Sequence, residues 1–219
     1  MAFSGVIFDF NGTLFWDTKL HNRAWDIFLT NHGLFLSDDD KFKKMHGKNN
    51  KDLFLSLFQT DLSDDKIQEY TLEKELLYQK LCLETDMQLA PGLIDFLDFL
   101  KGQKIPFTIA TASGKENLDF YFEHLPLSNW FEYDKVVYNN GKIEGKPAPQ
   151  IYQIALSVIN KKHEEVIIFE DAIAGLQSAK NANAGKIIIV DSNDDDYSDW
   201  SEYQKIKNFD QVDRLLFNN

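Results

Sequence analysis

The sequence predicts an α/β fold, a doubly wound parallel-sheet core of the Rossmann-like type with an all-helical cap domain inserted after the first strand. Short apolar runs alternate with helical patterns along much of the chain, which is typical of β-α-β units. After the first apolar run, about 70 residues are charged and helical in pattern, too long a stretch for a crossover connection. We therefore expect the core to comprise residues 1–15 and 87–219, and the helical cap residues 16–86.

The core elements follow from short apolar runs and the turn signals between them. The first strand is Val6-Ile7-Phe8, which ends at Asp9 and the turn-prone Asn11-Gly12. The other expected strands are residues 107–111, 135–138, 166–169 and 187–190. The expected core helices are residues 93–100, 115–122, 149–159 and 172–182. In the insert, Ser63 is placed to cap a long helix that runs toward Leu83.

Composition excludes several classes of partner. The chain has 219 residues and 43% hydrophobic content, enough for a buried core in one domain with an insert. Its formal net charge of −12 argues against nucleic acid and anionic membrane surfaces as partners. No apolar run approaches the roughly 18 residues that span a membrane. An acidic protein that handles phosphate needs a local positive site, so a metal ion and a few placed lysines are expected.

The setting is expected to be cytoplasmic, and the protein a monomer. The first ten residues, MAFSGVIFDF, lack a basic region and a cleavage site, so they predict a buried strand and not a signal peptide. Cys82 is the single cysteine, which excludes an intramolecular disulfide and favours a reducing compartment. The acidic stretch of residues 191–199 is interpreted as a solvated surface loop and not as a cation site.

Polar residues follow four of the predicted strands or the loops after them. They are the segments 9–13 (DFNGT), 111–114 (TASG), 145–149 (GKPAP) and 170–172 (EDA). Ligands bind beyond the carboxyl ends of the strands in an open parallel sheet. Each segment alone has a structural explanation, such as a helix cap for Asp9 or a surface charge for Lys146. Their joint occurrence at successive strand ends favours a common site.

One reaction type suits these residues. A carboxylate can attack phosphorus to give an aspartyl-phosphate, and the attack of one anion on another requires charge neutralisation. Two acidic strand ends together with a substrate phosphate suit Mg²⁺, which prefers hard oxygen ligands. Thr111 can donate a hydrogen bond to a phosphoryl oxygen, and Lys146 can supply a point charge. Gly12 permits close approach of the backbone to the phosphate.

The segments DFNGT, IATAS, GKPAP and FEDAIAGLQSA resemble the four motifs of the haloacid dehalogenase-like hydrolases, in the branch of β-phosphoglucomutase and small-metabolite phosphatases. The resemblance covers essentially the whole chain, including the place of the cap. It implies that Asp9 is the nucleophile and that Thr111 and Lys146 hold the phosphoryl group, with Ser113 nearby. It also implies a Mg²⁺ site formed by Asp9, the backbone carbonyl of Asn11 and Asp171, with Glu170 at or beside the metal. Dehalogenation itself is not expected, because the dehalogenases lack this acidic fourth motif.

Asn11 departs from the family pattern, which has aspartate at this position. That aspartate normally protonates the leaving oxygen and activates the hydrolytic water, and an amide does neither. Three interpretations stay open. The enzyme acts slowly or on good leaving groups, a water or His21 replaces the missing group, or the protein binds phosphorylated metabolites without turnover.

The cap is expected to set substrate specificity, because the phosphate site is generic. His21 is interpreted either as a substrate contact or as a helix residue beside Trp25. Gly47, Lys48 and Asn50 belong to a segment that resembles the substrate-contacting loop of the family's cap. β-Phosphoglucomutase has an arginine near Asn50 that clamps a second phosphate, and asparagine cannot make that contact. The favoured function is therefore hydrolysis of a small phosphorylated metabolite, such as a sugar phosphate. A mutase-like isomerase or a non-catalytic sensor is the alternative.

Overall fold

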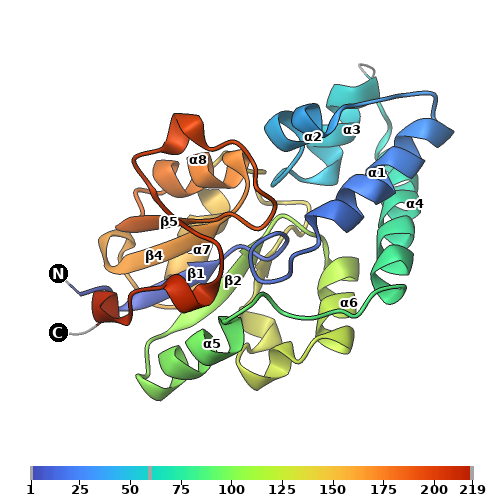
Figure 1. Cartoon of the computed structure of the whole chain (residues 1–219). Coiled ribbons are helices and arrows are strands. Elements are labelled where there is room, and N and C mark those ends of the chain that lie inside the picture. Colours follow the sequence, from blue (N-terminus) through green and yellow to red (C-terminus); the bar gives the residue numbers. More distant parts are fainter. Residues whose placement is uncertain (1, 59–60, 218–219) are drawn as a thin grey trace.

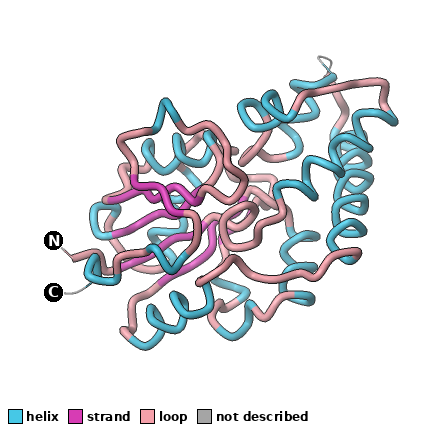
Figure 2. Tube along the Cα trace, viewed as in Figure 1, coloured by secondary structure: helices cyan, strands magenta, loops and turns pink. Residues whose placement is uncertain are grey.

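The computed structural model describes residues 2–58 and 61–217. A single parallel sheet of six strands forms the centre of the core (Figures 1 and 2). Its strands are β1 (Gly5–Phe8), β2 (Phe107–Thr111), β3 (Val137–Tyr138), β4 (Val166–Glu170), β5 (Lys186–Val190) and β6 (Gln204–Ile206). Their order in the sheet is β3-β2-β1-β4-β5-β6, with every neighbouring pair parallel. The order reverses at β1, so the predicted doubly wound core is confirmed.

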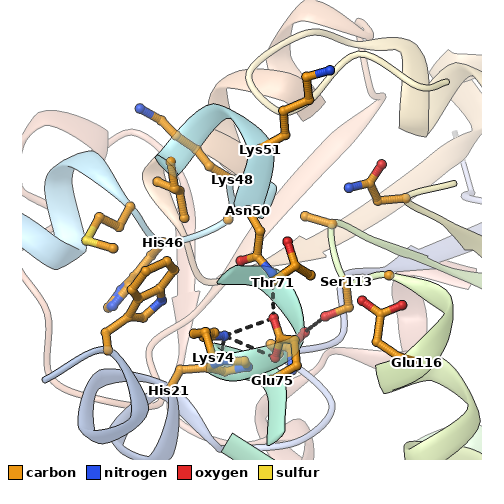
Figure 3. Close-up of a pocket in the computed structure, with 18 of the residues that line it drawn as sticks. His21, His46, Lys48, Asn50, Lys51, Thr71, Lys74, Glu75, Ser113 and Glu116 are labelled. Carbon is orange, nitrogen blue, oxygen red and sulfur yellow. Dashed lines mark hydrogen bonds and ion pairs between the residues drawn. The ribbon is translucent and has the colours of Figure 1, made fainter. Parts of the chain in front are cut away.

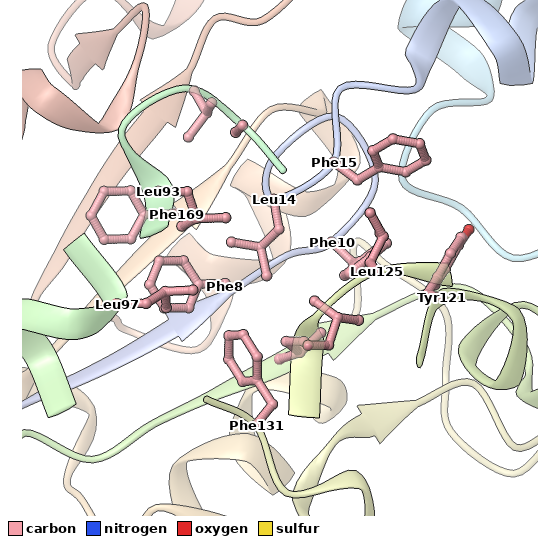
Figure 4. Packing of buried hydrophobic residues seen from close by; sticks show 14 of the residues in the cluster. Phe8, Phe10, Leu14, Phe15, Leu93, Leu97, Tyr121, Leu125, Phe131 and Phe169 are labelled. Carbon is pink, nitrogen blue, oxygen red and sulfur yellow. The ribbon is translucent and has the colours of Figure 1, made fainter. Parts of the chain in front are cut away.

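Helices cover both faces of the sheet, because the inner strands bury alternate side chains on opposite sides. On one face, Phe8 and Phe169 stack with ring centroids 5.3 Å apart and pack against α5 (Leu93–Gly102) and α6 (Lys115–His124) (Figure 4). On the other face, Ile7 and Ile168 pack against α7 (Gln150–Val158) and α8 (Ile173–Asn181). The chain begins and ends at the same side of the core, where the Phe3 amide donates to the Leu216 carbonyl.

The segment after β1 forms four helices beside the sheet: α1 (Thr18–Asn31), α2 (Asp38–Lys44), α3 (Asn50–Phe58) and α4 (Asp64–Leu83). They share a hydrophobic cluster of their own, in which Phe28, Phe54 and Tyr70 are packed together. The predicted start of α4 is confirmed, since Ser63 Oγ accepts a hydrogen bond from the Lys66 amide. Among the described residues, no helix is long and apolar enough to cross a membrane.

Three predictions about the core need correction. The strand expected over residues 135–138 is only Val137–Tyr138, because residues 133–135 form a 3₁₀ turn. β6 was not predicted, because this edge strand buries only Ile206 well and so carries no apolar run. The acidic stretch is not simply a solvated loop. Asp191 is buried and lies 2.8 Å and 2.9 Å from the ammonium groups of Lys205 and Lys207.

Short 3₁₀ helices complete the chain. They are residues Leu127–Asn129, Tyr133–Lys135, His163–Glu165, Ser198–Trp200, Phe209–Gln211 and Arg214–Phe217. The Phe209–Gln211 turn matters for the core, because Phe209 closes the aromatic cluster around Phe8 with ring centroids 6.0 Å apart. Phe209 thus joins the first strand to Phe96 of α5 in one packed cluster.

Candidate active site

Three buried carboxylates meet where β1 and β4 end. Asp9 follows β1, Glu170 ends β4 and Asp171 comes next, and one oxygen of each lies within 4.8 Å of the others. The two strands are adjacent and in register, with Phe8 opposite Phe169, which is why these side chains converge. The sequence prediction that the first and fourth polar segments lie together therefore agrees with this geometry.

Lys146 lies between two of these carboxylates. Its ammonium group is 2.6 Å from Asp9 Oδ1 and also contacts Glu170 Oε1, and its side chain is fully buried. The neighbouring carboxylates raise the pKa of Lys146, although burial opposes its charge. The residue is therefore a buried cation and not a surface charge before a proline turn. Three carboxylates and one ammonium leave a formal charge of −2 in this buried cluster.

That charge fits a divalent cation. Burial, together with Glu170 and against the pull of Lys146, raises the pKa of Asp9 to about 8. Burial also raises the pKa of Asp171 well above its ordinary value. A divalent cation would stabilise the ionised form of these buried carboxylates, and their hard oxygen donors suit Mg²⁺. Glu170 is engaged elsewhere, because its oxygens accept from Lys146, the Tyr152 hydroxyl and the Ala172 amide.

Gly12 allows the metal-binding candidates to come this close. Its φ is +77°, in the left-handed region that favours glycine. A Cβ at this position would lie 2.0 Å from Asp171 Oδ2. Any other residue at position 12 would therefore displace a carboxylate of the cluster.

Asn11 lies at the centre of a saturated hydrogen-bond network. Its amide nitrogen donates to Asp17 Oδ2 and to the Tyr121 hydroxyl, each at 2.7 Å. Its amide oxygen accepts from the Ser113 hydroxyl at 2.8 Å. The side chain therefore uses both donors and its acceptor on protein groups. The predicted Mg²⁺ ligand at this position is the backbone carbonyl of Asn11, and not its side chain.

Asp17 holds this network together and was not predicted from the sequence. It is fully buried, and it accepts from the Gly12 amide, Asn11 and the Tyr78 hydroxyl. Burial alone would raise its pKa, but His21 and these hydrogen bonds lower the pKa overall. Asp17 is thus an ionised carboxylate directly beside Asn11.

A pocket of about 300 Å³ opens above the carboxylates, between the core and the helices α1, α3 and α4. Asp9, Asn11, Ser113 and Asp171 form its floor. The predicted cap residues also line it, namely Gly47 and, labelled in Figure 3, His21, Lys48 and Asn50. Thr111, Lys146 and Glu170 do not line it. All three are buried, and the Thr111 hydroxyl accepts from the Ser113 amide at 3.1 Å.

The turn between α2 and α3 brings the helical segment onto the core. Gly47 adopts a φ of +77°, and a Cβ there would lie 2.9 Å from the Ala172 side chain at the start of α8. His46, in the same turn, donates from Nε2 to Asn22 Oδ1 at 2.8 Å. Burial lowers the pKa of His46 to about 4, so it is neutral near pH 7.

Several lining residues were missed because they lie on α4. Thr71, Lys74 and Glu75 face the pocket, and His21 of α1 stacks on Tyr78 with ring centroids 3.8 Å apart. Positions 71, 74, 75 and 78 share one helix face, so the spacing carried a signal. The sequence did not show that this face points toward the strand ends.

This arrangement defines an α/β enzyme class whose site lies at the carboxyl ends of a parallel sheet, under a helical segment. A family model described as haloacid dehalogenase-like hydrolase matches residues 3–183. The chain therefore belongs to the haloacid dehalogenase-like hydrolases.

Individual relatives agree with this assignment. A phosphorylated carbohydrates phosphatase from Thermotoga maritima is 26% identical over 188 residues, covering 83% of this chain and 82% of the relative. The crystal structure of a family hydrolase from Entamoeba histolytica superimposes with a TM-score of 0.86 at 34% identity, covering 99% of this chain and 100% of that one. A β-phosphoglucomutase from Clostridium difficile has a TM-score of 0.80 at 21% identity, covering 97% and 94%, and shows the shared fold.

Proposed function

We propose that the protein is a Mg²⁺-dependent phosphomonoester hydrolase that acts on a small phosphorylated metabolite through an aspartyl-phosphate on Asp9. The observation that carries the proposal is the buried cluster of Asp9, Lys146, Glu170 and Asp171 beneath the pocket. Relatives named as phosphatases of phosphorylated carbohydrates and of fructose 1-phosphate support the substrate class.

In the first step, an Asp9 oxygen attacks phosphorus, a P–O bond forms, and the ester P–O bond breaks with its electrons on the leaving alcohol oxygen. In the second step, water attacks the same phosphorus, the bond to Asp9 breaks, and inorganic phosphate leaves. Lys146 lies 2.6 Å from Asp9 Oδ1, so it can balance negative charge in both steps. Glu170 and Tyr152 orient Lys146 from behind.

Asp9, Asp171 and the backbone carbonyl of Asn11 would hold the Mg²⁺, which supplies positive charge next to the phosphoryl oxygens. Because its oxygens already have partners, Glu170 is assigned the role of holding Lys146 and not that of a direct ligand. We further propose that residues 16–86 act as a cap over this pocket. Thr111 is assigned to the phosphate subsite through its contact with Ser113.

Asn11 favours one second candidate, a sensor that binds phosphorylated metabolites without turnover. Its amide offers no transferable proton, and its hydrogen bonds are used within the protein. In the hydrolase, the leaving oxygen must take its proton from water or from another pocket group.

Phosphate release from p-nitrophenyl phosphate and from a panel of sugar phosphates, with and without Mg²⁺, tests the proposal. We expect Mg²⁺ to increase phosphate release by the wild type. We expect Asp171→Asn to lose this increase. Asp199→Asn, an exposed aspartate distant in sequence, is the matched control. Binding without release supports the sensor, and isomer interconversion without release supports a mutase. Metal dependence retained in Asp171→Asn would overturn the metal assignment.

A further inference from the structure

The inner wall of the pocket carries an ion pair whose charge is already neutralised. Lys74 and Glu75 are adjacent on α4, and only 2% and 5% of their surfaces are exposed. The Lys74 ammonium lies 3.0 Å from His21 Nδ1, 3.1 Å from Glu75 Oε1 and 3.2 Å from Glu75 Oε2. These contacts account for its three N–H donors, so the ammonium has none left for a ligand.

Glu75 is equally occupied. Asn50 donates to its Oε1 at 2.7 Å, and Asn117 donates to its Oε2 at 2.8 Å. Although burial alone would raise its pKa, Lys74 and the two amides lower the pKa of Glu75, so the carboxylate is charged. A phosphate at this wall would meet a buried carboxylate and a cation that is already paired. Like charges brought together out of water repel each other strongly.

Asn50 presents an acceptor to the pocket. Its amide nitrogen donates to Glu75, so its carbonyl oxygen points away from Glu75 (Figure 3). Thr71 adds a hydroxyl group to the same wall. The amide oxygen of Asn50 can accept from a substrate hydroxyl group but not from a phosphate dianion, which offers only acceptors, and the Thr71 hydroxyl can donate or accept.

The other pocket lysines lie at the rim. Figure 3 shows the side chains of Lys48 and Lys51 pointing away from Thr71 and Glu75. Lys51 is exposed and lies 3.2 Å from Asp64. Lys48 is half-buried, but its side chain is directed away from the wall that carries Lys74 and Glu75. The exposed ammonium group of Lys51 attracts a phosphorylated substrate over a distance but adds little specific binding. The remaining lining near this wall, Trp25, Leu53 and Ile67, is apolar.

From these contacts we infer that the inner wall of the pocket binds an uncharged, hydroxyl-bearing part of a substrate that carries a single phosphate. The Lys74–Glu75 pair, together with Asn50, excludes a second phosphate from this wall. This inference rests on the proposed function and specifies its substrate class as monophosphorylated polyols and sugars. Asn50 and Glu75 are then determinants of specificity, and Asp9 and Lys146 handle the phosphate common to all substrates.

Fructose 6-phosphate and fructose 1,6-bisphosphate share a carbon skeleton and test the inference directly. We expect kcat/KM to favour the monophosphate by at least about tenfold, since tenfold corresponds to only about 1.4 kcal/mol. Glu75→Gln removes the negative charge and should reduce that preference at least about tenfold, mainly through a lower KM for the bisphosphate. Glu69→Gln, an exposed change on the same helix, should leave the preference as it is. Equal use of both substrates by the wild type, or an unchanged preference in a folded Glu75→Gln protein, overturns the inference.

A second variant covers the case in which Glu75→Gln does not fold. Asn50→Leu removes the acceptor at the start of α3. We expect it to lose about five- to tenfold in kcat/KM with fructose 6-phosphate, and little with p-nitrophenyl phosphate, which has no hydroxyl groups. An equal loss with both substrates would instead indicate general damage to the pocket and would contradict the inference.

Calorimetry separates this inference from the proposed hydrolysis. If the wild type releases phosphate from none of these esters, the hydrolase proposal fails. Binding of the same two fructose phosphates in the presence of Mg²⁺ then tests the pocket alone. Tighter binding of the monophosphate supports the inference, whereas tighter or equal binding of the bisphosphate, or binding of neither, overturns it.

Discussion

Replacing Asn11 by aspartate would place a carboxylate oxygen where the amide nitrogen now donates to Asp17 Oδ2 at 2.7 Å. Two unit negative charges at that separation repel by roughly 6 kcal/mol at an effective dielectric constant of about 20. This is equivalent to about four pKa units. The two carboxyl groups should therefore share one proton near neutral pH, which an unfolded aspartate releases near pH 4.

The shared proton makes the stability of Asn11→Asp depend on pH. The folded pKa of the pair is raised above the unfolded value, so the variant's deficit is small near pH 4 and grows as the pH rises. At about 1.4 kcal/mol per pH unit, the loss in unfolding free energy is about 1.5 kcal/mol at pH 5 and about 4 kcal/mol at pH 7. Urea unfolding with a chelator present, at both pH values, measures this difference. Asn129→Asp, on an exposed turn, makes the same chemical change without a buried neighbour.

The same variant bears on chemistry, because the new carboxyl group can hold a transferable proton. General acid–base assistance is typically worth about 10²–10⁴-fold. Single-turnover transfer from a sugar phosphate should therefore rise much more than transfer from p-nitrophenyl phosphate, whose leaving group hardly needs a proton. A stability deficit that is the same at pH 5 and pH 7 would refute the shared-proton reasoning. Equal single-turnover rates on a sugar phosphate would show that another group already supplies the proton.

Three further predictions concern the carboxylate cluster. Lys146→Ala should lose most activity and about 3–5 kcal/mol of unfolding free energy, because Asp9 and Glu170 lose their buried cation. An unchanged unfolding free energy, measured by calorimetry, would contradict this. Gly12→Ala should weaken Mg²⁺ binding, measured by titration calorimetry, because its Cβ would lie 2.0 Å from Asp171 Oδ2, and wild-type affinity would be the contrary result. Burial raises the pKa of Asp9 to about 8, so the stability of metal-free protein should fall as the pH rises from about 4 toward 8. Added Mg²⁺ should then raise the Tm more at pH 8 than at pH 6, and an equal rise would count against metal binding at Asp9.

The sequence by itself determined the core and the convergence of its strand ends. Buried parallel strands such as Val6–Phe8 and Val166–Phe169 are continuous apolar runs, and this local pattern needs no knowledge of partners. Topology then requires that the carboxyl ends of adjacent parallel strands meet. Asp9 and Asp171 could be placed together for that reason. Lys146 could be placed among the candidates because its segment follows a predicted strand, but a lysine in a loop has no spacing that reveals its burial or its partners.

Only the tertiary structure decided how the helical segment completes the site. The helix that became α4 was predicted, but its rotation about its own axis depends on packing against α1 and the core. That rotation buries Lys74 and Glu75 at the pocket wall instead of exposing them as an ordinary surface pair. The partners of Asn11 were hidden for the same reason. Tyr121 is 110 residues away in sequence, and Asp17 is fixed beside Asn11 by Tyr78 of α4. Contacts between distant segments come from the folded packing of the chain, and a local sequence pattern does not encode them.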